Sequence, residues 1–129
     1  MEYRMVAYTK EGMDKLIEIV GVDHAKKAIE HFEGLAPEFS ECIVNYVYGI
    51  VATNSKLNGK TRELAIVSNI MGQGSSQFAL AAHLKCMINE GWTKEEIIQI
   101  VIELTQYNGF PRCIETLEIF KTVCQDLGI

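Results

Sequence analysis

The sequence predicts an all-α fold. Apolar side chains recur three and four residues apart through most of the 129 positions, which is the spacing that gives a helix one apolar face. No stretch keeps the alternation of apolar and polar residues that is typical of a half-buried strand. Glycines, prolines and hydroxyl residues separate the periodic segments, as they do at helix ends. We therefore expect about six to seven helices, packed as antiparallel hairpins.

Three helices are expected in the first part of the chain. Asp23 can cap the second of them through its side-chain oxygen, and Pro37 suits the first turn of the third. We expect these helices at about residues 13–20, 23–32 and 37–53.

The second of the next two helices carries His83, the first candidate catalytic residue. A helix beginning near Thr61 is nearly apolar in its second half until Gly72-Gln73-Gly74 breaks it, so it should be buried on most sides. Ser75 or Ser76 can cap the following helix. That helix carries His83 in its middle and ends near residue 91.

Two more helices complete the chain. Thr93 and Glu96 have the spacing of a capping box, in which each side chain satisfies a backbone N–H near the other residue. The helix they open should stop at Asn108-Gly109, and Pro111 fits the first turn of a last helix. Because no repeat, linker or low-complexity tract is present, one domain over residues 1–129 is the simplest expectation, with a semi-independent appendage over the first 35 residues as the alternative.

Composition excludes several functions. The formal charge is −5 and the basic residues are scattered, so neither nucleic acid nor an anionic membrane is expected as a partner. No apolar run approaches the roughly 20 residues that cross a bilayer, and residues 1–4 lack the features of a secretory signal. We therefore expect a soluble, cytoplasmic protein.

Four segments, in this order, resemble the carboxymuconolactone decarboxylase family. They are Thr61-Arg62-Glu63-Leu64, Ala79-Leu80-Ala81-Ala82-His83, Gly91-Trp92-Thr93-Lys94-Glu95-Glu96-Ile97 and Tyr107-Asn108-Gly109-Phe110-Pro111. The resemblance is strongest over residues 57–123. It implies an all-helical fold like that of the AhpD-type proteins and assembly as a homo-oligomer, either a trimer or a hexamer.

The residues before His83 separate two chemistries within this family. Members that resemble AhpD are thiol peroxidases and carry cysteines seven and four residues before the histidine, where this chain has Ser76 and Ala79. Neither side chain can attack peroxide or resolve a sulfenic acid, so a dithiol peroxidase is disfavoured. Decarboxylase-type members lack those cysteines and keep a histidine and a glutamate that match His83 and Glu63. This branch implies a lyase of aromatic-compound catabolism that removes carbon dioxide from a carboxylated lactone, with neither a metal nor an organic cofactor.

The decarboxylase resemblance assigns roles to five side chains. His83 would donate or relay the proton that quenches the electron pair left by carbon dioxide, because imidazole titrates near neutral pH. Glu63 would hold the tautomer of the imidazole or share its proton. Arg62 is a candidate anchor for a substrate carboxylate, and Ser76 and Tyr107 are candidate substrate-binding residues. The family's decarboxylases usually carry an acidic residue shortly before the histidine, which this chain lacks, so the substrate stays open.

Structural interpretations remain beside these roles. A glutamate in a first helical turn is stabilised by the helix dipole whatever its chemistry, Arg62 can form a surface or intersubunit ion pair, and Tyr107 can pack in the core. Two alternative functions also remain. One is a redox accessory protein that uses Cys86 or Cys113, and the other is a helical oligomer without catalytic activity.

Overall fold

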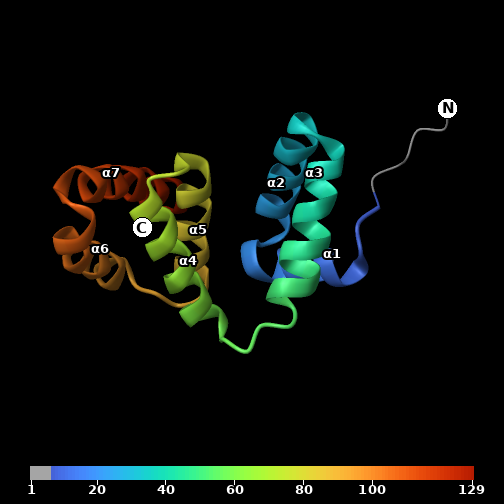
Figure 1. Ribbon diagram of the computed structural model, residues 1–129, viewed down its shortest axis with the longest axis horizontal. Coiled ribbons are helices and arrows are strands. Elements are labelled where there is room, and N and C mark those ends of the chain that lie inside the picture. The colour runs from blue at the N-terminus through green and yellow to red at the C-terminus, as the bar shows by residue number, and fades with distance from the viewer. Residues whose placement is uncertain (1–6) are drawn as a thin grey trace. The chain divides into compact units, whose positions relative to one another are not determined.

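The computed structural model describes residues 7–129, and its regular elements there are all helical (Figure 1). This confirms the predicted all-α class. The chain divides into two compact units, of which the first ends at Lys56 and the second begins at Leu57. A single domain over residues 1–129 stays a prediction. Among the helices of the described range, none has both the length and the apolarity needed to span a membrane.

The first unit contains four helical elements. They are α1 (Lys10–Val20), α2 (Val22–Leu35), α3 (Pro37–Cys42) and the π-helix η1 (Ile43–Ala52). The predicted cap at Asp23 is wrong, because α2 already begins at Val22 and its N-cap is Gly21, without a side-chain hydrogen bond. Gly21 has a positive φ of 85°, a conformation that glycine adopts without strain. The chain therefore passes from α1 to α2 through one residue.

Helical structure extends from α3 through η1, close to the predicted helix at 37–53, but its second part is π-helical. At its end the Thr53 N–H donates to the Tyr48 carbonyl, five residues back, at 3.2 Å. Helix α1 packs closely against η1, since a Cβ on Gly12 would lie 2.4 Å from the carbonyl oxygen of Val44. A Cβ on Gly49 would lie 3.4 Å from the Gly12 Cα. Two glycines thus allow this close backbone contact.

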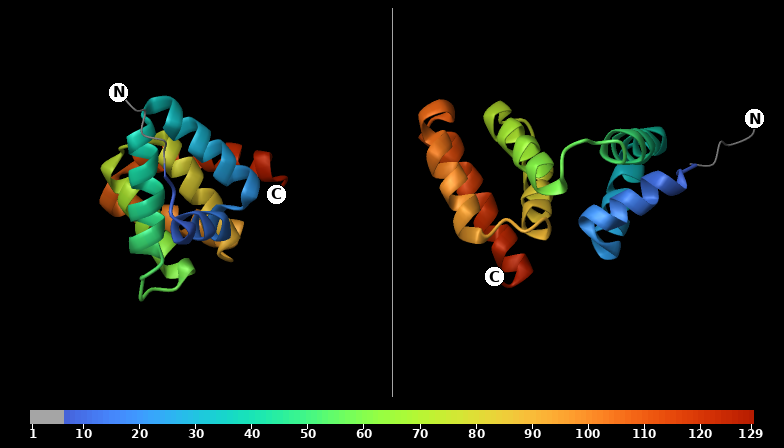
Figure 2. Two further views of the ribbon diagram at one scale, coloured as in Figure 1. Left: turned by 90° about the vertical axis from the view of Figure 1, so that its right-hand side faces the viewer. Right: turned by 90° about the horizontal axis from the view of Figure 1, so that it is seen from below.

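The second unit contains the four helices that correspond to the family-like segments. They are α4 (Gly59–Gln73), α5 (Gln77–Asn89), α6 (Lys94–Asn108) and α7 (Phe110–Leu127). Ser76 caps α5 by accepting a hydrogen bond from the Ala79 N–H at 3.1 Å, and Thr93 with Glu96 forms a capping box. Both predicted caps are confirmed. Short turns join α4 to α5 and α6 to α7, and the helices of each pair pack together (Figure 2).

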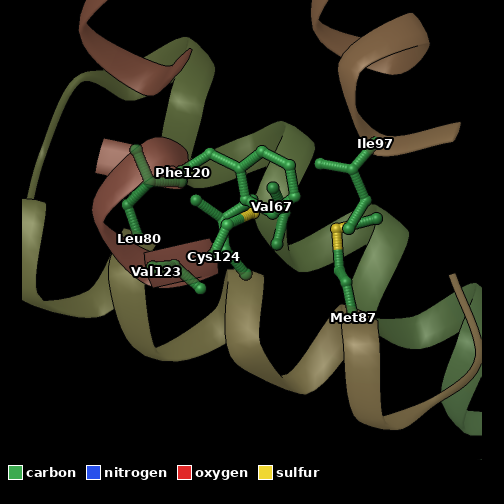
Figure 3. Close-up of a cluster of buried hydrophobic side chains, with 8 residues drawn as sticks. Val67, Leu80, Met87, Ile97, Phe120, Val123 and Cys124 are labelled. Atoms are coloured by element: carbon green, nitrogen blue, oxygen red, sulfur yellow. The ribbon is translucent and has the colours of Figure 1, made fainter. Parts of the chain in front are cut away.

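A buried apolar cluster connects the four helices of this unit (Figure 3). Its members are Val67 of α4, Leu80, Leu84 and Met87 of α5, Ile97 of α6, and Phe120, Val123 and Cys124 of α7. Leu80, Leu84 and Met87 follow the spacing of one helix face. Burial of this face fixes the rotation of α5 about its axis, and so sets the directions in which its remaining side chains point.

Trp92 connects the loop before α6 to the start of α4. Its indole Nε1–H donates to the carbonyl oxygen of Lys60 at 2.9 Å, and the Lys60 ammonium lies 4.5 Å from the centre of the indole ring. The indole therefore holds the first turn of α4 by a hydrogen bond and a cation–π contact. Arg62 and Glu63 follow directly along this helix.

Candidate active site

Glu63 is a carboxylate in the interior of the second unit. It is 1% exposed, although burial of a charged carboxylate is costly unless the group is paired. Helix α4 begins at Gly59, after the N-cap Asn58, rather than near Thr61. Glu63 therefore lies beyond the first turn, where the helix dipole stabilises a carboxylate less. Its burial must be supported by side-chain partners.

His83 is the first of these partners. Its Nδ1 lies 2.9 Å from Oε2 of Glu63, and its side chain, on α5, keeps 24% of its surface exposed. A carboxylate accepts hydrogen bonds, so the geometry favours a proton on Nδ1. The other ring nitrogen, Nε2, is then the atom that can take or deliver a proton during a reaction.

Arg62 is the second partner. Its Nη2 lies 3.7 Å from Oε1 of Glu63, and its side chain is 12% exposed. The two oxygens of the carboxylate are thus divided between a guanidinium and an imidazole. The Nε of Arg62 is buried and has no hydrogen-bond partner among the described residues. An unsatisfied buried donor is costly, so a shift of the side chain that gave this N–H an acceptor would stabilise Arg62.

Cys86 lies beside the pair. Its sulfur, an oxygen of Glu63 and a ring nitrogen of His83 all lie within 4.8 Å of one another. Burial and, as a smaller contribution, the negative charge of Glu63 raise the pKa of Cys86 to about 12. Burial also raises the pKa of Cys113. Both environments stabilise the thiol over the nucleophilic thiolate, which argues against the redox-accessory alternative.

Two predicted substrate-binding residues lie apart from this cluster. The Ser76 hydroxyl is used as the cap of α5, and Ser76 lines a cavity of about 240 Å³ together with Met71, Arg112 and Thr116. The lining of this cavity includes neither Glu63 nor His83. Tyr107 is 79% exposed near the end of α6, so it is not a core residue of this chain. Roles for Ser76 and Tyr107 in substrate binding stay predictions.

The structure thus brings together three of the five predicted residues. Arg62, Glu63 and His83 form a chain from guanidinium to carboxylate to imidazole, which can orient a proton donor and present a positive charge to an anionic molecule. Sequence reasoning missed the place of Cys86 in this cluster. Its spacing of three residues from His83 indicated a neighbouring position on α5, but only the packing of α4 shows that Glu63 meets both.

A buried carboxylate and an imidazole thus meet on adjacent helices, and no cysteine stands seven or four residues before the histidine. The chain belongs to the carboxymuconolactone decarboxylase family, whose model matches residues 37–122. The match starts 20 residues before the segment expected from the motifs, and so it includes α3 and η1 as well as α4 to α6 and most of α7.

Two characterised relatives are decarboxylases. The 4-carboxymuconolactone decarboxylase of Acinetobacter baylyi is 26% identical over 120 residues, which cover 93% of this chain and 89% of the relative. The nitrosuccinic acid decarboxylase of Metarhizium robertsii is 26% identical over 117 residues, which cover 91% of this chain and 81% of the relative. An uncharacterised 15.0 kDa protein of Paracoccus denitrificans is 28% identical over 102 residues, with coverage of 74% and 76%.

The environments of the cysteines lead to a prediction about thiol reactivity. Cys86, Cys113 and Cys124 are buried, whereas Cys42 is exposed. We expect the Cys42→Ser variant to react only slowly with a chromogenic disulfide reagent at pH 8 under native conditions, and to release all three remaining thiols in denaturant. A thiol of the native variant that reacts as fast as free cysteine, and that a further Cys86→Ala substitution removes, would contradict the inert environment assigned to Cys86.

Proposed function

We propose that this protein is a decarboxylase of a small carboxylic acid, and that His83 supplies the proton and Glu63 orients it. The observation that carries the proposal is the contact of 2.9 Å between Nδ1 of His83 and Oε2 of the buried Glu63. Two decarboxylase relatives support it. The acids in their names differ, but each has a carboxylate and an electron-withdrawing group, a lactone in one case and a nitro group in the other.

The reaction requires one bond to break and one proton to be delivered. The bond between the substrate carbon and its carboxylate breaks, carbon dioxide leaves, and the electron pair stays on the substrate, where the electron-withdrawing group delocalises it. Nε2–H of protonated His83 then gives its proton to carbon, and the imidazole recovers a proton from solvent. The hydrogen bond between Nδ1 and Glu63 keeps the ring oriented for this transfer.

Arg62 has the geometry for a second role. Its guanidinium is mostly buried, and one of its N–H groups has no partner within the described residues. An arginine presents several donors in a planar fork that matches a carboxylate. We assign Arg62 to the binding of a carboxylate or lactone oxygen that stays on the molecule during the reaction. This role is binding and orientation, in contrast to the proton transfer assigned to His83.

The first test compares the wild-type protein with His83→Ala. We expect release of carbon dioxide from 4-carboxymuconolactone or nitrosuccinate, with kcat lower by roughly 100- to 10,000-fold in the variant because a general acid contributes about that much. Substrate loss and carbon dioxide release are the measurements. His31→Ala on α2 is the matched control and should keep wild-type turnover. Equal turnover by His83→Ala would refute the assigned role.

A second test addresses Arg62. The Arg62→Lys substitution keeps the positive charge but removes the planar fork, so we expect KM to rise by about 10- to 100-fold with a smaller change in kcat. Steady-state kinetics with the acid that the wild-type protein accepts measures both. An unchanged KM would show that Arg62 compensates the charge of Glu63 and does not bind the substrate.

We also propose that the protein assembles with further copies of itself. Large apolar side chains are exposed around the junction of α6 and α7, where Ile102, Tyr107, Phe110 and Ile114 are each at least half exposed. Apolar patches of this kind mark interaction surfaces, and the family resemblance suggests a trimer or a hexamer. Light scattering on the purified chain should give three or six copies, and Phe110→Lys should lower that number. A monomer that turns over substrate would overturn the proposal.

The non-catalytic alternative stays testable in the same experiments. A stable oligomer that is inert toward both acids would favour a scaffold without chemistry over the decarboxylase. A parallel assay with peroxide and a dithiol separates the thiol-peroxidase alternative, which requires a reactive thiolate.

A further inference from the structure

We propose that Glu63, His83 and Cys86 form a binding site for a zinc-type divalent transition-metal ion, and that the bound ion inhibits the protein. One oxygen of Glu63, one ring nitrogen of His83 and the sulfur of Cys86 all lie within 4.8 Å of one another. The metal site is inferred from these three groups and does not require the proposed decarboxylase function. The inhibition rests on the proposed decarboxylase function, because it requires a reaction to inhibit.

The positions of the donors suit coordination by small side-chain movements. Ligand atoms of a tetrahedral zinc ion are about 3.3–3.7 Å apart, given bonds of about 2.0–2.3 Å. The contact between His83 and Glu63, at 2.9 Å, is slightly shorter than this, and the sulfur is the atom that must approach. His83 and Cys86 lie one turn apart on α5, and Glu63 projects from α4. Each donor therefore stands on a helix rather than on a loop.

The types of donor select the class of metal. Thiolate and imidazole ligands favour zinc, cobalt or copper over magnesium and calcium, which prefer oxygen. When the ion binds, the Cys86 thiol loses its proton to solvent and a metal–sulfur bond forms, while the oxidation state of the metal does not change. The charges of the thiolate and of Glu63 then balance the two positive charges of the ion. Arg62, near the other oxygen of Glu63, opposes binding and limits the affinity.

Occupancy would weaken the proton donor. A metal bonded to Nδ1 of His83 takes the place of the proton that this nitrogen shares with Glu63, and it also withdraws the charge of Glu63 from the imidazole. The ring then cannot form the imidazolium, and Nε2–H of a neutral, metal-bound imidazole is a much weaker acid. Three protein ligands leave a fourth position, which water can fill on the partly exposed side of His83. The protein should therefore be active without metal and inactive with it.

The experiment uses the full-length Cys42→Ser chain, because Cys42 is an exposed cysteine that would bind metal non-specifically. Chelator-treated, reduced protein is titrated with Co²⁺, and the thiolate-to-cobalt charge-transfer absorption is followed in the near ultraviolet. We expect one Co²⁺ per chain and displacement by Zn²⁺. A further Cys86→Ala substitution should abolish the absorption. Cys124→Ala is the matched control, since Cys124 is also buried on a helix of this unit, and it should keep the absorption. Circular dichroism confirms that both variants are folded.

The activity measurement follows on the same proteins. Zn²⁺ should inhibit carbon dioxide release by the Cys42→Ser protein, a chelator should restore it, and Cys86→Ala should need at least about tenfold more Zn²⁺ for the same inhibition. Absorption by a protein that turns over neither acid would support the metal site and reject the decarboxylase. Turnover without any cobalt–thiolate absorption, or absorption that persists in Cys86→Ala, would overturn the site. Loss of activity on chelation that Zn²⁺ restores would overturn the inhibitory role.

Discussion

The negative charge of Glu63, buried among helices, is the constraint on which the site depends. A carboxylate removed from water must be compensated by nearby positive charge and hydrogen bonds, and loss of one partner of a buried ion pair typically costs about 3–5 kcal/mol. Arg62 and His83 supply this compensation from α4 and α5. The same contacts that stabilise the fold therefore orient the imidazole. The proposed catalytic role of Glu63 and its structural role therefore do not exclude each other, because one arrangement would serve both.

The burial that requires partners for Glu63 also decides the chemistry of its neighbour. Cys86 stands next to a buried negative charge in a region with little water, and both factors keep its sulfur protonated. A cluster of this kind favours movement of a proton at His83 over attack by a thiolate. A bound metal ion would reverse the preference of Cys86 for the thiol form. Its positive charge stabilises the thiolate, whereas the negative charge of Glu63 disfavours it. The two proposed uses of the cluster, proton transfer and metal binding, therefore exclude each other.

Local features of the fold were predictable from the sequence, whereas contacts between distant residues were not. The caps at Ser76 and Thr93 depend on side chains within three residues, so their residue types suffice to identify them. The cap at Asp23 was not correct, because Gly21 allows α2 to begin two residues earlier than a side-chain cap requires. The π-helical turns of η1 also escaped prediction. Their sequence has ordinary apolar periodicity, and close packing of Gly12 against η1 involves residues far apart in the chain.

In the candidate site too, the local motifs were predictable and the contacts between distant residues were not. Family-like motifs indicated Glu63 and His83 separately, and only the packing of α4 on α5 joins them at 2.9 Å. The contact of Cys86 with Glu63 could not be predicted from its spacing, since positions on either side of His83 look alike until the face of α5 that meets α4 is known. The motifs also indicate Ser76 and Tyr107 as substrate-binding residues. In the structure Ser76 lines a cavity whose lining includes neither Glu63 nor His83, and Tyr107 is exposed.

The contact between Trp92 and the start of α4 gives the protein an optical probe. Trp92 is the single tryptophan of the chain, and its indole is bonded to the Lys60 carbonyl, two residues before Arg62. Indole emission responds to the hydrogen bond and to the nearby ammonium group. Ultraviolet fluorescence of the unlabelled protein therefore reports on the first turn of α4, which carries Arg62 and directly precedes Glu63. Ligand-induced rearrangement of that turn can be followed in real time without a chromophore on the ligand.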